Sequence, residues 1–197
     1  REATADILHI PAGTTVIEKD AYRNRTEITS VIFPEGLLEI GASAFAGCEN
    51  LQSVHLPEGL HTIGRNAFKD CSALQSVHLP ATLKVIDQWA FKECATLSEI
   101  TLPDGLEQLE EMAFKGCESL SAIRIPKSLQ NLSRSVFSSC TSLSKIELHE
   151  NITVIGDYAF KDCAAVTSID WPKNLTTIGK WAFKGCCALT SVRLPET

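Results

Sequence analysis

Residues 51–73 read LQSVHLPEGLHTIGRNAFKDCSA, and this pattern returns along the 197-residue chain with a period of 23. Phe, Cys and Pro show the period most plainly, because each returns at the same place in successive copies. A fixed period without insertions or deletions is typical of a repeat protein, in which each unit packs against its neighbours. The periodic residues are Phe45, Phe68, Phe91, Phe114, Phe137, Phe160 and Phe183; Cys48, Cys71, Cys94, Cys117, Cys140, Cys163 and Cys186; and Pro11, Pro34, Pro57, Pro80, Pro103, Pro126, Pro172 and Pro195, with His149 at the one missing Pro position.

One repeat predicts a strand, a turn, a second short extended stretch and a helical turn. Val54 and Leu56 alternate with polar residues, which is the period of a strand with one buried face. Pro57 lacks an amide donor and ends that strand, and the next two residues form a turn. Residues 60–63 form the second short extended stretch, in which the chain returns after the turn. Residues 66–71 carry apolar side chains at spacings of one, three and four, which predicts a single helical turn.

A single 23-residue unit cannot bury this many apolar side chains, so the units are expected to stack with their strands paired in parallel. The sequence then predicts one continuous array over residues 1–197. Residues 1–33 form a degenerate N-terminal capping repeat, since Tyr22 and Arg25 replace the usual Phe and Cys. Residues 34–194 form seven regular repeats, and residues 195–197 begin a truncated next one.

The eight cysteines are predicted to be mostly reduced and buried. Seven of them occupy one position of the repeat, so their side chains stack in a row and point the same way rather than toward one another. Free buried cysteine behaves as a small apolar residue. Cys187 lies one position later, where other repeats carry Glu or Ser, and is expected to be exposed and reactive.

The pattern L-P-x-x-L-x-x-I-G-x-x-A-F-x-x-C-x-x-L-x-x-I-x-L resembles the BspA-like, or Treponema pallidum-type, class of leucine-rich repeats. The resemblance covers residues 8–197. It implies a mainly β, right-handed solenoid with a parallel sheet on its concave side. It also implies an extracellular or cell-surface location and a part in adhesion. The chain departs from the pattern at Asp87, Glu110 and Ser133, where Gly is usual, and these changes are expected to alter single turns without affecting the fold.

The concave strand face is the candidate binding surface. Its outward positions vary from repeat to repeat while the inward positions do not, which is typical of a rigid scaffold with a replaceable face. A face that is merely solvated would also be polar, so both interpretations stay open. The candidate ligand-binding residues are His55, His78, Thr101, Arg124, Glu147, Asp170, Arg193, Glu99 and Lys145.

Other kinds of site find little support. His55 and His78 should lie side by side, but no third ligand falls nearby, so no metal site is predicted. The net charge of −6 and the absence of a basic block argue against nucleic acid, and no apolar run is long enough to span a membrane. No catalytic or cofactor-binding motif occurs. Trp89 and its equivalents are either an exposed patch or lids packed on the core.

The sequence therefore predicts a non-enzymatic module that recognises a protein or a glycan, as part of a cell-surface adhesin. The alternative is a structural spacer that presents another domain.

Overall fold

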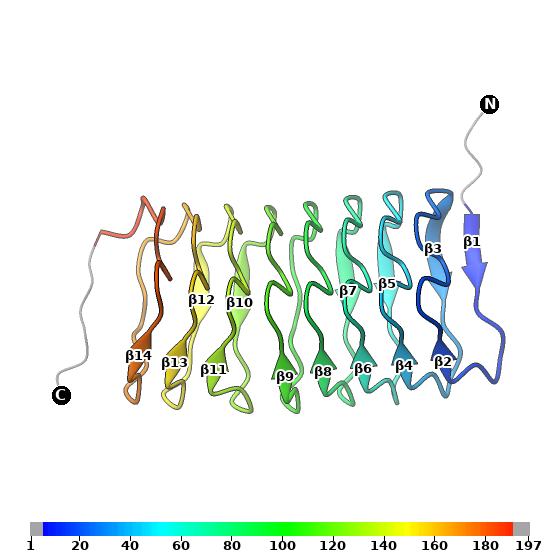
Figure 1. Cartoon of the computed structure of the whole chain (residues 1–197), viewed down its shortest axis with the longest axis horizontal. Coiled ribbons are helices and arrows are strands. Elements are labelled where there is room, and N and C mark those ends of the chain that lie inside the picture. The colour runs from blue at the N-terminus through cyan, green and yellow to red at the C-terminus, as the bar shows by residue number, and fades with distance from the viewer. Residues whose placement is uncertain (1–5, 191–197) are drawn as a thin grey trace.

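In the computed structural model, which describes residues 6–190, the chain winds into a stack of about eight coils of about 23 residues each (Figure 1). The coils are called rungs 1 to 8, and rung 1 contains Tyr22 while rungs 2 to 8 contain the seven periodic Phe residues in order. Each rung has three sides: a first strand segment, a second strand segment and a turn segment. The predicted repeat solenoid is confirmed.

The strands form two rows, and neighbours within a row pair in parallel with partners 23 residues apart, as Val54 does with Val77 and Ile40 with Ile63. This register places identical positions of the repeat above one another. The first row holds β1 (Asp6–His9), β3 (Ile28–Ile32), β5 (Ser53–His55), β7 (Ser76–His78), β10 (Ala122–Arg124) and β12 (Lys145–Glu147). The second row holds β2 (Val16–Ile17), β4 (Glu39–Ile40), β6 (Thr62–Ile63), β8 (Val85–Ile86), β9 (Gln108–Leu109), β11 (Asn131–Leu132), β13 (Val154–Ile155) and β14 (Thr177–Ile178).

The core consists of continuous columns of identical side chains. Phe68 and Phe91 are fully buried, and their ring planes lie 4° from parallel with centroids 5.4 Å apart. The columns of Leu and Ile from the two strand rows fill the space beside the rings. One unbroken hydrophobic cluster therefore runs the length of the stack, and each rung depends on its neighbours to exclude water.

The turn segment differs from the expected helical turn, because no helix is present among the described residues. In residues 64–71, alternate amides donate to the carbonyl three residues earlier, as Ala67 N–H does to Gly64 O at 3.1 Å. The amides between them donate to the next rung, as Phe68 N–H does to Ala90 O at 2.8 Å. Asn66 and Asp70 have φ of 59° and 61°, which breaks the helical path. The apolar spacing was compatible with both conformations, so the helical prediction was wrong.

A glycine at the corner after the second strand sets how closely two rungs approach. A Cβ added to Gly64 would lie 2.7 Å from Ile40 O and 2.9 Å from Ala42 N, both backbone atoms of the preceding rung. Without a Cβ, Gly64 N–H donates to Ile40 O at 2.8 Å. Where Asp87 replaces this glycine, the equivalent bond to Ile63 O lengthens to 3.0 Å. The corner residue thus controls the contact between rungs.

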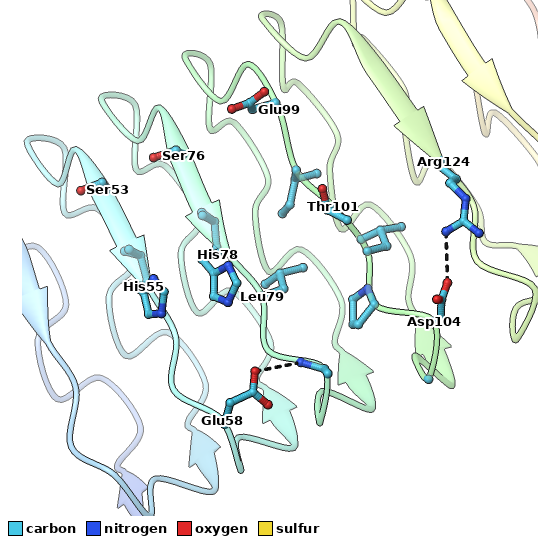
Figure 2. A pocket seen from close by; sticks show the side chains of 17 residues that line it. Ser53, His55, Glu58, Ser76, His78, Leu79, Glu99, Thr101, Asp104 and Arg124 are labelled. Atoms are coloured by element: carbon cyan, nitrogen blue, oxygen red, sulfur yellow. Dashed lines mark hydrogen bonds and ion pairs between the residues drawn. The ribbon is translucent and has the colours of Figure 1, made fainter.

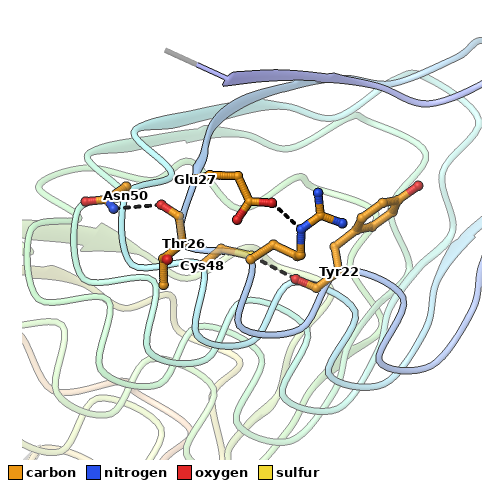
Figure 3. Close-up of polar contacts among 6 residues, drawn as sticks. Tyr22, Thr26, Glu27, Cys48 and Asn50 are labelled. Carbon is orange, nitrogen blue, oxygen red and sulfur yellow. Dashed lines mark hydrogen bonds and ion pairs between the residues drawn. The ribbon is translucent and has the colours of Figure 1, made fainter. Parts of the chain in front are cut away.

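The first rung closes the N-terminal end of the column (Figure 3). Arg25, which stands where later rungs have Cys, donates to Glu27 beside it. Asn50 Nδ2 of the next rung donates to Thr26 O at 2.7 Å. The Cys48 thiol donates to Tyr22 O at 3.2 Å. Arg25 and Glu27 thus pair with each other where later rungs place a buried thiol, and the bonds from Asn50 and Cys48 join rung 2 to rung 1.

The cysteine prediction is confirmed: all eight cysteines are free, the seven periodic ones are buried and Cys187 is exposed. Each periodic thiol donates to the carbonyl of the aromatic residue in the preceding rung, as Cys94 Sγ does to Phe68 O at 3.2 Å. Burial raises the pKa of Cys48 to about 11 and that of Cys163 to about 12. The thiols are thus held in their protonated form as hydrogen-bond donors within the core.

Candidate functional site

The first strand row carries the candidate binding residues on its outer face. Inward side chains such as Val54 and Val77 enter the core, and the alternation of the strand turns their neighbours outward. The predicted residues that lie within the described part of the chain are all exposed; they are His55, His78, Glu99, Thr101, Arg124, Lys145, Glu147 and Asp170. Arg193 lies outside the described residues.

The first row is interrupted at rung 5. β1, β3, β5 and β7 form one sheet, and β10 and β12 form another. Between them residues 98–102 form no strand, and among the described residues a single bridge, from Ser76 to Glu99, joins this segment to the first sheet. The rung keeps the usual alternation of the repeat, with Ile100 and Leu102 buried. The interruption therefore changes the strand pairing while the inward side chains of rung 5 stay buried.

A hollow of about 1040 Å³ lies over this interruption (Figure 2). Outward side chains of four rungs surround it: Ser53 and His55 from rung 3, Ser76 and His78 from rung 4, Glu99 and Thr101 from rung 5, and Arg124 from rung 6. Five of the nine predicted residues thus line one concavity. Apolar atoms of Leu79, Leu102 and Pro103 contribute to the same hollow.

The two histidines stand side by side at one end of the hollow. Their rings are 4.2 Å apart and within 9° of parallel, because β5 and β7 pair His55 directly with His78. Among the described residues no group of three or more His, Cys, Asp or Glu is placed to hold a metal ion.

Carboxylates from the loops that follow the strands complete the rim. Asp104 accepts a hydrogen bond from Arg124 at 3.0 Å, and this ion pair joins rung 5 to rung 6. Glu58 accepts a bond of 3.4 Å from the backbone amide of Ala81, which joins rung 3 to rung 4. The rim thus presents both signs of charge above an apolar floor, an arrangement suited to another polar surface.

The remaining predicted residues lie on the same face but outside the hollow. Lys145 and Glu147 project from β12 and pair with each other at 3.3 Å. Asp170 belongs to rung 8, whose residues 168–170 form no strand.

Glu58 and Asp104 were missed by the prediction. They belong to turns that are expected to be solvated in any repeat, and the only signal was that each is an acidic residue next to Gly, at Glu58-Gly59 and Asp104-Gly105. The width of the hollow could not be inferred either, because it arises from an unpaired rung.

The aromatic row on the turn side is only partly accessible. Trp89 lies under the guanidinium of Arg65, 4.4 Å from its ring centroid, and its indole N–H points at Met112 Sδ at 2.9 Å. Trp181 is 49% exposed, with Lys184 3.9 Å from its ring centroid. Trp89 is thus partly covered, whereas Trp181 stays exposed at the end of the row.

Residues 6–190 contain no helix that is long and apolar enough to cross a membrane.

Comparisons with known proteins agree with this architecture. The sequence profile of the BspA type leucine rich repeat region matches residues 4–117 and 84–197, with six copies of the repeat. A leucine-rich repeat protein from T. pallidum has a similar structure, with a TM-score of 0.75, 25% identity, and coverage of 94% of this chain and 78% of that one. No curated protein matches the chain.

Two further solved structures share the fold. A leucine-rich repeat protein from Eubacterium ventriosum aligns with a TM-score of 0.61 and 20% identity, and the alignment covers 96% of this chain but only 45% of that one. A leucine rich cell surface protein from Faecalibacterium prausnitzii aligns with a TM-score of 0.56 and 23% identity, covering 96% of this chain and 67% of that one. Repeat proteins of this type are non-enzymatic and are generally protein-binding or surface-associated. The profile match spans the described rungs from end to end, and the chain belongs to the BspA-type leucine-rich repeat family.

Proposed function

We propose that this chain is the recognition module of a cell-surface adhesin and that it binds a protein through the hollow on its first strand row. The observation that carries the proposal is the hollow itself, in which side chains from four successive rungs converge on one concavity. Concave surfaces with a few placed polar groups are the usual sites of recognition on a packed scaffold.

The chemistry of the rim favours a protein over a glycan. Glu58, Glu99 and Asp104 line the hollow together with Arg124 and the histidine pair. A protein surface supplies side chains of both signs that can complement such a rim, whereas the neutral hydroxyls of most sugars use fewer of these charges. Phe68, Phe91 and Phe114 of rungs 3 to 5 are fully buried, so each of these rungs presents a preformed wall to the partner.

The surface location rests on the family and on its relatives. BspA-type proteins are generally surface-associated, and the F. prausnitzii relative is a cell surface protein. This chain spans less than half of the E. ventriosum protein. An array of this kind can therefore form one part of a longer protein.

Reversing one charge at the centre of the hollow should abolish most of the binding. The chain is first tested against purified extracellular-matrix and cell-surface proteins and against a glycan array. For a protein that binds, Glu99→Lys is expected to weaken the dissociation constant by about tenfold or more, because a like charge then faces the partner. Biolayer interferometry measures the change.

Glu49→Lys is the matched control, since Glu49 is also exposed but does not line the hollow. This variant should bind like the unchanged chain. Protein binding that survives Glu99→Lys would contradict the use of the hollow, and binding to glycans alone would contradict a protein partner. An array that binds nothing in either assay would favour the spacer role.

A further inference from the structure

We propose that the junction between rungs 5 and 6 is a hinge that widens and narrows the hollow, with Ser133 as its cause and the Asp104–Arg124 ion pair as its latch. The existence of the hinge stands on the geometry of the stack alone. Its effect on binding rests on the proposed function, because it concerns the same hollow.

Both strand rows lose their pairing at this junction. In the second row β9 belongs to a sheet with β2, β4, β6 and β8, whereas β11 belongs to a separate sheet with β13 and β14. In the first row residues 98–102 form no ladder with β10, and a single backbone bond, from Ser121 N–H to Ser98 O at 3.2 Å, joins the two rungs before the strand begins. β9 and β11 stand visibly further apart in Figure 1 than other neighbours in their row. Within residues 6–190, no other junction lacks strand pairing in both rows.

The corner residue explains the separation. At most other corners the backbone amide donates to the preceding rung, as Gly156 does to Leu132 O at 2.8 Å and Glu110 to Ile86 O at 3.0 Å. The amide of Ser133 donates to no backbone carbonyl among the described residues. Its hydroxyl donates to Leu109 O at 2.6 Å instead. Asp87 and Glu110 also have a Cβ at this corner and keep the amide bond, so the difference lies in the Ser133 hydroxyl, which occupies the Leu109 O acceptor and holds the two rungs apart.

The core beside the junction confirms that the rungs are less tightly closed. Leu109 is 4% exposed and Leu129 is 5% exposed. The equivalent residues of rung 3, Ile63 and Leu60, are fully buried. The phenylalanine rings on either side of the junction are 5.7 Å apart, compared with 5.4 Å within rungs 2 to 5 and 5.6 Å between rungs 6 and 7. A junction with fewer hydrogen bonds and looser packing is where an array yields first.

The turn row remains bonded and supplies the axis. Met112, Phe114 and Gly116 donate their amides across the junction to Arg134 O, Val136 O and Ser138 O at 2.9–3.0 Å. The same three bonds occur at every other junction of the described stack. The turn row keeps its three bonds, whereas the first strand side keeps a single backbone bond and the second keeps only the bond from the Ser133 hydroxyl. The halves can therefore rotate about the turn row, which is a hinge motion.

The latch spans the open side. Asp104 of rung 5 and Arg124 of rung 6 both line the hollow, and their ion pair crosses the junction. Both side chains are more than half exposed, so water weakens their attraction and the latch can open and close readily. Rotation about the turn row would change the distance from Arg124 to the histidine pair and therefore the width of the hollow.

Distances between spin labels test the hinge without any ligand. Labels are attached in a Cys187→Ser background at Glu39→Cys and Thr177→Cys, exposed strand positions on opposite sides of the junction. This pair should give a broad distance distribution that broadens further in Asp104→Asn. Ser133→Gly should narrow it, because the amide of residue 133 can then bond to Leu109 O.

A second pair, Val16→Cys with Gln108→Cys, lies wholly within rungs 1 to 5 and serves as the control. Its distribution should be narrow and unaffected by Ser133→Gly, but Gly64→Ser should broaden it by opening the corner between rungs 2 and 3. Circular dichroism checks that each variant is folded. The hinge is overturned if the first pair is as narrow as the second and does not respond to Ser133→Gly. That outcome would leave binding through the hollow untouched.

Discussion

Replacing Phe114 with Ala is expected to lower the free energy of unfolding by about 3–5 kcal/mol. Phe114 is fully buried in the middle of the column, with the rings of Phe91 and Phe137 5.4 and 5.7 Å away. The substitution removes a large apolar side chain from between two neighbours that backbone bonds hold in place, so the cavity cannot collapse. Urea titration followed by circular dichroism measures the loss.

Phe183→Ala is the matched comparison at the last described turn. Phe183 packs on Phe160 and Trp171 but keeps part of its surface exposed, so less apolar area returns to water and the loss should be clearly smaller. If both variants lost the same free energy of unfolding, the rings would not form a column in which an interior ring is more buried than an end ring.

One thiol of the eight should react in the native protein at neutral pH. Cys187 is exposed, whereas the other seven are buried and donate hydrogen bonds to backbone carbonyls. The thiolate is the reactive form, and burial raises the pKa of these seven thiols and so suppresses it. The buried thiols react only after unfolding, which should slow them by about a thousandfold or more. Titration with a chromogenic disulfide, before and after denaturation, counts the thiols that react in the native protein and those that react only in the unfolded protein.

Alkaline pH should weaken the fold through the same groups. The pKa of each buried thiol is raised in the folded state. The stabilisation is therefore complete below the ordinary thiol pKa of 9.0 and is lost as the pH rises above it, because the unfolded thiols then ionise.

Cys187→Ser is the control for the thiol titration: this variant should lose the fast reaction and still show seven thiols after denaturation. More than one fast thiol in the unchanged protein would contradict a buried cysteine column.

The columns of the core were predictable because a fixed period places identical residues above one another. Phe68, Cys71 and Ile63 could be assigned to the interior from spacing alone, and the stacking of His55 on His78 followed from the same register. The conformation of the turn segment was not predictable from its apolar residues, because a series of turns and a helical turn both direct these side chains into the core. The Gly, Asn and Asp residues at the position of Asp70 were the missed signal, because they favour positive φ.

The hollow was only partly predictable. Its outward residues were identified from alternation, but their convergence depends on the loss of strand pairing in residues 98–102, which keep a normal repeat sequence. Ser133 was recognised as a departure from Gly and was expected to matter only to its own turn. Its effect is between rungs, and the distance between rungs is set by backbone contacts that a sequence pattern does not express.

Amide hydrogen exchange in the native protein tests the central claim most directly, namely one stack bonded throughout along its turn row and weakened at a single junction. The amides of Phe114 and Gly116 should exchange slowly, like Phe68 and Asp70 in the equivalent places, because all four donate to the next rung. The amides of Gln130 and Ser133 should exchange fast, while Thr153 and Gly156 one rung later stay protected by bonds to Gln130 O and Leu132 O. Equal protection at residues 133 and 156, or fast exchange along the turn row at the same junction, would contradict the account.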